Sequence, residues 1–360
     1  MNDRGAIGDF LREHDAVAVG MSPSLPLIPE DPEGEGKPTT VDLDVEQKAG
    51  NWQSVIVPEA PARAGEFPLR FIDGSQAGQP VLCLSLKGRG WPIPLFFSEI
   101  GAVALSLEGR GFKRTFHVVE RVLSFVADPF PWEQVEAFSA ALSNNPNFRI
   151  RVLPANLPDL TKYSPFDYEV MRTQARARTL EEMTNLERLA LAQDRSVPTL
   201  VDGPLDRVMG NPDADGPLVV GVPKMQAASY LNDSTWPTLL KLQPGRRTPV
   251  FQIKREGSIA VATWYLKLAR GTEAAPNWGY VRVEVPWNQF EYRGCDFNFV
   301  NRLSRWIVDA RCRASSYARM PVSLEPIVRA EDALKPLFTP LSVLVNRLYR
   351  QAGLFRRNEL

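Results

Sequence analysis

The segment from Tyr168 to Gln193 contains no glycine or proline and is rich in strong helix formers, so it predicts one long helix. Short apolar runs separated by glycine-containing turns lie on both sides of it, which is typical of strands. VLCLSL and FHVVERVLSFV precede the helix, and TPVFQIK and GYVRVEVP follow it. This order predicts an α/β fold in which helices flank a mixed sheet.

The composition restricts the chemistry that the chain can support. Because 42 Lys and Arg balance 42 Asp and Glu among 360 residues, any contact with nucleic acid must come from a local basic surface. The sequence has 2 histidines and 3 widely spaced cysteines, which excludes a three-histidine zinc centre and a disulfide framework. Carboxylates are therefore expected to carry any catalysis.

Three regions are expected along the chain. Residues 1–66 include a stretch rich in Pro, Gly and Glu, which predicts an N-terminal arm or a small module. Residues 67–335 form the main domain, with an inserted segment near 128–165 that is rich in Pro and Asn. Residues 336–360 predict a basic amphipathic helix. No signal peptide and no membrane-length apolar run is found, so a cytoplasmic protein is expected.

Two aspartates follow apolar runs and precede glycines. Asp73 lies in RFIDGS and Asp202 in LVDGPL, so each is expected at the end of a strand where the chain turns away. Strand ends are rigid places at which α/β sheets present ligands, and two such ends in one sheet can converge. The alternative for each is an ordinary turn, because Asp and Gly both tolerate left-handed backbone angles.

A third carboxylate, Glu187, lies in an apolar stripe of the predicted long helix. A carboxylate that faces the core must be paired or bind a cation. The alternative is a buried ion pair with an arginine of the same helix, Arg176 or Arg178. Glu181 and Glu182 fall off the stripe and are expected to be solvated.

Together the three acids predict a hard-oxygen site for Mn²⁺ or Mg²⁺. Two such ions about 4 Å apart can hold the attacking and leaving oxygens of a phosphodiester and activate water. Nucleic-acid hydrolysis is the reaction that follows from such a site.

The runs RFIDGS, LVDGPLDRV, GVPK and YVRVEVP, in this order, resemble the NurA family. The resemblance covers roughly residues 68–332, apart from the segment near 128–165. It implies an RNase H-like fold and a nuclease that processes DNA double-strand-break ends together with the HerA hexameric translocase. It also implies that Asp73, Glu187 and Asp202 are catalytic metal ligands.

Two parts of the resemblance concern further residues. By position Lys224 would lie beside the metals as a cation for a phosphate or the scissile oxygen, or it is an ordinary surface lysine. The family's Tyr-Pro pair is Met320-Pro321 here, and no histidine follows His117. Glu331 or Asp332 could replace the family's C-terminal histidine as the fourth ligand, or both are exposed acids at a helix start.

The resemblance predicts a metal-dependent deoxyribonuclease that resects DNA ends in recombinational repair, of the 5′–3′ exonuclease type and with endonuclease activity as a further expectation. Double- and single-stranded DNA ends, a HerA-type hexameric ATPase and a second copy of the chain are the expected partners, and a nucleoid-associated location follows. The sequence has no phosphate-binding P-loop, so the motor must be another protein. Basic residues near TPVFQIK are expected to follow the DNA backbone: Arg246, Arg247, Lys254 and Arg255.

Two alternatives remain open. The first is a catalytically silent NurA-like scaffold that binds DNA or the translocase, which the missing C-terminal histidine favours. The second is a different RNase H-like nuclease that acts on RNA or on hybrids.

Overall fold

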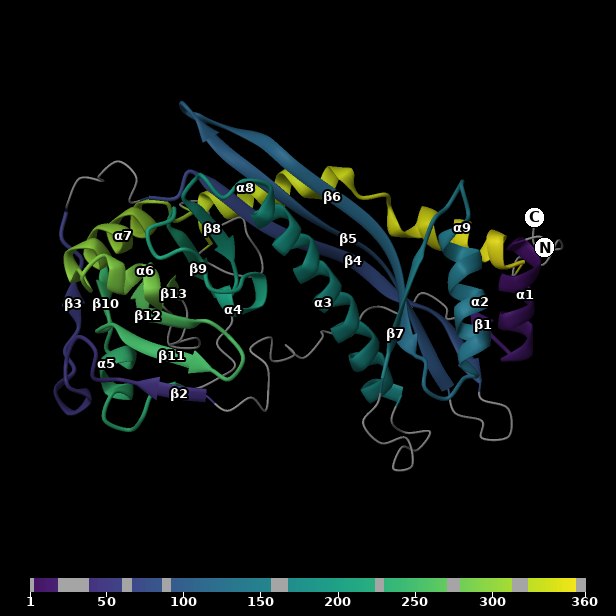
Figure 1. The fold of residues 1–360 in the computed structure, drawn as a ribbon, viewed down its shortest axis with the longest axis horizontal. Coiled ribbons are helices and arrows are strands. Elements are labelled where there is room, and N and C mark those ends of the chain that lie inside the picture. The colour runs from purple at the N-terminus through teal and green to yellow at the C-terminus, as the bar shows by residue number, and fades with distance from the viewer. Residues whose placement is uncertain are drawn as a thin grey trace.

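The computed structural model describes residues 3–18, 39–59, 67–85, 92–156, 168–223, 230–270, 279–312 and 323–353. The molecule is elongated, and a ribbon of long strands connects a lobe at each end (Figure 1). Within the described ranges, no helix has both the length and the apolar character needed to cross a membrane.

Three long antiparallel strands form the middle of the molecule: β4 (Arg70–Ser85), β5 (Pro92–Glu108) and β6 (Gly111–Val126). Helix α3 (Tyr168–Gln193) crosses one face of this ribbon (Figure 1), with the bounds that the sequence predicts. Side chains of β5 alternate, so Ala102 packs in the cluster that contains Leu186 of α3, whereas Val103 packs against Leu334 of α8 (Glu325–Leu334). The two helices therefore cover opposite faces of the ribbon.

The strands join in one sheet with the order β2-β11-β12-β13-β9-β8-β4-β5-β6-β7. Strand β8 (Thr199–Asp202) is parallel to both β4 and β9 (Val219–Val222), and β7 (Arg151–Ala155) is parallel to β6. The other pairings in this order are antiparallel. The expected fold, a large mixed sheet flanked by helices, is confirmed at this level.

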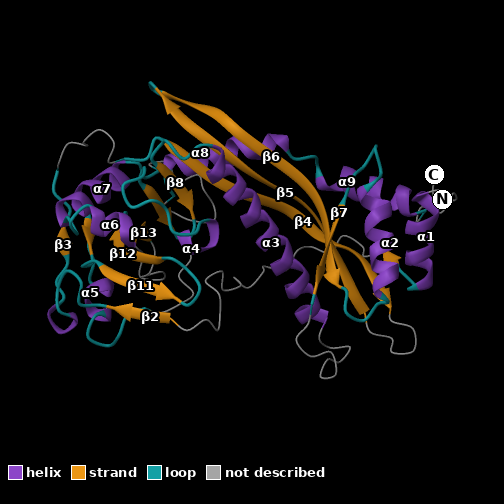
Figure 2. Cartoon of the chain, viewed as in Figure 1, coloured by secondary structure: helices purple, strands orange, loops and turns teal. Residues whose placement is uncertain are grey.

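The lobe around β8 and β9 continues the sheet through β10 (Arg246–Arg247), β11 (Phe251–Arg255), β12 (Ala260–Lys267) and β13 (Tyr280–Pro286). Short helices α4 (Leu205–Val208), α5 (Trp236–Leu240) and α6 (Trp287–Tyr292) and the longer α7 (Phe297–Asp309) surround these strands (Figure 2). Every residue of β13 is buried, including Arg282 and Glu284.

The N-terminal segment from residue 39 onward belongs to the same lobe and is not a separate arm or module. Strand β2 (Thr39–Asp42) pairs with β11, and β3 (Val55–Ile56) pairs with β10. Between them the turn η1 (Ala49–Asn51) precedes the buried Trp52. Glu46 accepts two hydrogen bonds from the buried Arg247, at 2.7 and 2.9 Å, and one from the backbone N–H of Val250 at 2.7 Å.

The other lobe is built from segments that the sequence places far apart. Helices α1 (Asp3–Glu13), α2 (Trp132–Ser143) and α9 (Leu341–Ala352) surround the far ends of β4, β5 and β6 (Figure 1), with β1 (Val17–Ala18) paired to β4. Their buried side chains form one apolar cluster that includes Phe10, Phe138 and Leu348. The segment 128–165, expected as an insertion, therefore contributes α2 and β7 to this core.

The Glu46–Arg247 pair predicts that residues 39–57 are essential for stability. Glu46→Ala would leave the buried Arg247 guanidinium without its carboxylate, which we expect to cost about 3 to 5 kcal/mol. Urea unfolding of the full chain would measure this. Glu256→Ala, at an exposed glutamate of the β11–β12 hairpin, is the control and should unfold with the wild type. An equally stable Glu46→Ala protein would contradict this account of the N-terminal segment.

Candidate functional site

Asp202 is the last residue of β8, as the sequence predicts. The chain leaves the strand at Gly203, whose φ of 115° lies in the region that favours glycine. The side chain of Asp202 is half-buried. An acid therefore ends a rigid parallel strand at the middle of the sheet.

Asp73 does not end a strand, which corrects the prediction from the sequence. Strand β4 continues through Asp73 and Gly74 as far as Ser85, and Asp73 pairs with Val103 of β5. The Asp-Gly pair is therefore not a turn. The ladder between β4 and β8 ends at the pair Ile72 and Val201, so Asp73 and Asp202 are the next residues on the two neighbouring strands.

The end of β8 leaves one edge of β4 open. β4 pairs with β8 only as far as Ile72, and β1 joins the same edge only at Leu82 and Cys83. Within the described part of the chain, no strand covers this edge between Asp73 and Val81. Side chains from both faces of the sheet can therefore meet at this edge, beside the two aspartates.

Glu187 of α3 packs over this edge. A Cβ atom at Gly74 would overlap Glu187 Oε1 and lie 3.0 Å from Glu187 Cδ, so glycine leaves room for the Glu187 carboxyl group in this position. The backbone N–H of Gly74 donates a hydrogen bond to the Glu187 carboxyl group. The glycine of the Asp-Gly motif is thus explained by its contact with Glu187 and not by a turn.

The environment of Glu187 raises its pKa to about 8. The largest cause is burial, which disfavours the charged carboxylate, and the next is the negative charge of Asp202. The guanidinium of Arg207 and the Gly74 N–H act in the opposite direction and lower the pKa. Glu187 is thus buried, as predicted, and the nearby cation is Arg207, whereas Arg178 pairs with Glu181 and Glu182.

Glu182 differs from the prediction that it is solvated. Its side chain is buried and pairs with Arg151 of β7 as well as with Arg178. The sequence could not show this because Arg151 comes from the segment that was expected to be an insertion.

The acids approach the open edge from both faces of the sheet. Asp73 shares the face of its partner Val103, which α8 covers, whereas Glu187 comes from α3 on the other face. On α8, Glu331 is half-buried and pairs with Lys335 at 3.0 Å, whereas Asp332 is exposed. In the described residues, no three His, Cys, Asp or Glu side chains are grouped so that they could hold a metal ion.

A buried polar network supports the loop that follows Asp202. Glu284 of β13 accepts a hydrogen bond from the backbone N–H of Leu205 at 2.8 Å and one from Arg282 at 2.7 Å. Asp206, in α4 just after this loop, pairs with Arg255. Burial raises the pKa of Glu284 even though Arg282 opposes the shift. The alternation in YVRVEVP did not reveal this network, because it is also typical of a strand with one solvated face.

Most of the basic residues expected to follow DNA are occupied inside the protein. Arg247 is fully buried against Glu46, and Arg255 is 5% exposed and bonds Asp206 and the Tyr230 hydroxyl group. Burial excludes both guanidiniums from surface contact with a phosphate backbone, which corrects their assignment. Arg246 is half-buried and donates to Ser54, and Lys254 is exposed. Lys224 lies outside the described residues.

Comparisons with known proteins give one distant structural similarity to report. No family model and no curated protein matches the sequence. Among solved structures, the NurA nuclease from Sulfolobus solfataricus is similar over 85% of this chain and 89% of that chain, with 13% identity and a TM-score of 0.46. This similarity is too low to assign the chain to a family or to an activity.

The raised pKa of Glu187 predicts how stability depends on pH in the metal-free protein. The folded state keeps this proton up to about pH 8, whereas the unfolded chain releases it near the ordinary value of 4.5, so stability from this group is lost as the pH rises between the two. In EDTA, the urea midpoint of the wild type should therefore fall more between pH 5 and pH 8.5 than that of Glu187→Gln. Glu181→Gln, exposed on the same helix, should follow the wild type. Equal pH dependence of wild type and Glu187→Gln would show that Glu187 titrates normally.

Proposed function

We propose that this chain is a metal-dependent nuclease that cleaves DNA at the open edge of β4. The observation that supports this most is the position of Glu187, a buried carboxyl group near Asp202 that contacts Gly74, the residue after Asp73, at the edge where β8 stops. Two neighbouring acids repel each other, Arg207 and the Gly74 N–H offset only part of this, and a bound cation would stabilise both carboxylates.

We also propose an RNase H-like arrangement for the centre of the sheet. The three antiparallel strands β4, β5 and β6, followed by α3 and the parallel strands β8 and β9, are in keeping with it. The sequence motifs that resemble the NurA family fall on this part of the fold, with RFIDGS on β4 and LVDGPLDRV on β8 and α4. In this proposal β4 and α3 provide the rigid frame of the site.

The residues fit a hard divalent cation in their chemistry. Asp73, Glu187 and Asp202 offer only carboxylate oxygens, the ligands that Mn²⁺ and Mg²⁺ prefer. Bound cations, one or two, would polarise the phosphodiester and supply the hydroxide nucleophile. The protein holds Asp202 at its position through the Glu284 network, and Arg207 can neutralise charge on the phosphate.

The biological setting remains part of the same proposal. A nuclease of this kind would resect double-strand-break ends in the 5′–3′ direction, as a homodimer, beside a HerA-type hexameric ATPase in the cytoplasm. The absence of a P-loop in the sequence supports the need for a separate motor.

Cleavage of end-labelled linear DNA with Mn²⁺, Mg²⁺ or EDTA tests the proposal. We expect metal-dependent degradation by the wild type, lowered roughly 100-fold or more in Asp73→Asn and in Asp202→Asn, because each removes a ligand to the charge-stabilising ion. Both variants should be at least as stable as the wild type in EDTA, since each removes one negative charge from carboxylates that repel one another.

DNA binding without cleavage by the wild type under every metal condition would instead support the silent scaffold. Degradation of RNA or hybrids in place of DNA would identify the other RNase H-like alternative.

Variants of the two acids on α8 can identify the fourth metal ligand. Glu331 is half-buried on the helix that covers Asp73's face of the sheet, and Asp332 is exposed. We therefore expect Glu331→Gln to lower the cleavage rate roughly tenfold or more, and Asp332→Asn to leave it unchanged. The rates should be compared across a range of Mn²⁺ concentrations. The reverse order would assign the role to Asp332, and two fully active variants would remove α8 from the site.

A further inference from the structure

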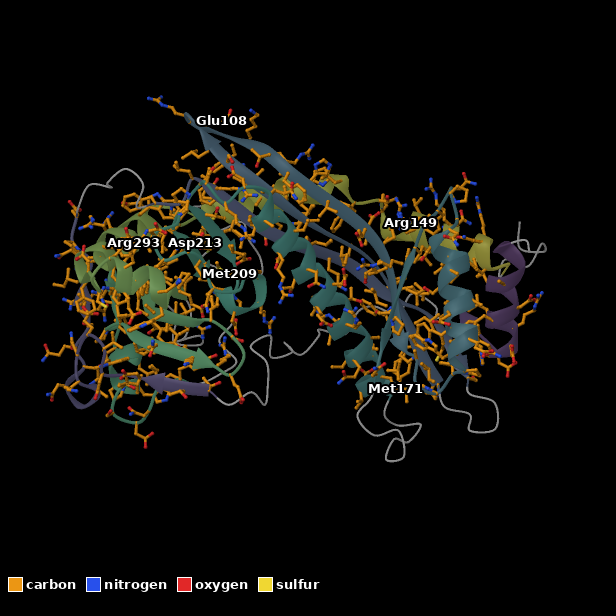
Figure 3. All side chains as sticks on the ribbon, viewed as in Figure 1. Glu108, Arg149, Met171, Met209, Asp213 and Arg293 are labelled. Atoms are coloured by element: carbon orange, nitrogen blue, oxygen red, sulfur yellow. The ribbon has the colours of Figure 1, made fainter. Side chains whose placement is uncertain are left out.

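A cavity of about 400 Å³ lies away from the carboxylates, where β6 and the chain that leads into β7 meet the residues that follow α8. Figure 3 labels Arg149, which lies near the start of β7. Three arginines dominate the lining, together with two glutamates, one valine and one leucine: Arg121, Arg149, Arg151, Glu99, Glu120, Val119 and Leu337.

The three arginines differ in how they are held. Arg121 is fixed by Glu99 at 3.1 Å and lies over the ring of Phe148, at 5.3 Å from its centroid. Arg149 is exposed and, among the described residues, has no ion pair or hydrogen bond.

Arg151 is held by acidic residues on two sides, Glu120 at 3.5 Å and the buried Glu182. Because Glu182 also pairs with Arg178, the acids around the cavity do not balance its guanidinium groups. The cavity therefore keeps positive charge that can be directed at an anion.

Glu99 and Arg121 of the lining share a sheet face with Asp73, whereas Glu120 and Arg151 lie on the α3 side. Across β4, β5 and β6, Asp73 pairs with Val103 and Val103 with His117, and four residues further along Ala77 pairs with Glu99 and Glu99 with Arg121. An even separation puts these side chains on the same face, about 13 Å apart along the strands. Neither ladder has a register shift between these pairs. Helix α8 and the residues after it cover this face between the two places, so a strand that contacts both must pass over α8.

We propose that this cavity binds a backbone phosphate of the nucleic-acid strand whose cleavage takes place at the carboxylates. The inference rests on the proposed function. Guanidinium groups form paired hydrogen bonds with phosphate oxygens, and the fixed Arg121 beside the exposed Arg149 offers two such groups in one cavity. This contact would position the strand without reading its sequence.

Binding of a fluorescein-labelled single-stranded oligonucleotide tests the site, measured by anisotropy with the full chain in EDTA at several salt concentrations. Arg149→Ala should weaken binding severalfold and reduce the slope of log K against log salt by about 0.7, the value for one lost phosphate contact on single strands. Arg347→Ala is the matched control, because Arg347 is an exposed arginine of α9 in the same lobe and does not line the cavity. It should retain wild-type affinity.

Glu120→Gln provides a test in the opposite direction. It removes a carboxylate that occupies Arg151, so binding should become tighter by a few fold. Loss of affinity in Glu120→Gln, or equal losses in Arg149→Ala and Arg347→Ala, would overturn the site in favour of a diffuse electrostatic attraction.

The binding and cleavage experiments together distinguish failure of the phosphate site from failure of the catalytic site. If the wild type cuts DNA and Asp73→Asn does not, while Arg149→Ala binds normally, the phosphate site is wrong and the nuclease proposal stands. If Arg149→Ala binds weakly but Asp73→Asn still cuts, the phosphate site stands and the catalytic assignment fails. A wild type that binds no oligonucleotide overturns the phosphate site, and one that also cuts no DNA with Mn²⁺ or Mg²⁺ overturns both.

Discussion

The parallel ladder between β4 and β8 joins only three pairs of residues, and the arrangement of the candidate site depends on how short it is. A longer β8 would cover the edge of β4 and separate the two faces of the sheet. Because it stops at Asp202, that residue lies next to Asp73, and Gly74 keeps an edge N–H that Glu187 can accept from. Arg70 of β4 stabilises this geometry. Its buried guanidinium donates hydrogen bonds to the carbonyl of Asp194 at 2.6 Å and to that of Ala190 near the end of α3.

Much of this frame could be predicted from local sequence. The absence of Gly and Pro defines α3, the apolar run before Asp202 defines β8, and helical spacing identifies Glu187 as buried. The position of Asp73 was harder to predict, because the dipeptide Asp-Gly occurs both in turns and in strands where a glycine leaves room for a neighbouring side chain. Only the contact between Gly74 and Glu187 distinguishes the two.

Other features could not be predicted because they depend on pairing between distant segments. Glu46 and Arg247 are separated by about two hundred positions, and a Pro- and Gly-rich N-terminus gives no sign that part of it completes a core. Arg282, Glu284, Arg255 and Asp206 look like solvated charges on their own strands and turns. In the fold they share one interior, where each charge is tolerated only because another is present.

The lobe made by α1, α2 and α9 has a consequence for how the chain is synthesised. Ile7 and Phe10 of α1 share their apolar cluster with Leu344 and Leu348 of α9, so α1 completes its packing only when α9 has been made. Until α9 leaves the ribosome, the far ends of the long strands keep part of their apolar surface uncovered. Such a surface is prone to aggregation during translation, and contacts so distant in sequence form slowly. Nascent chains of this protein should therefore depend on chaperones until α9 has been made.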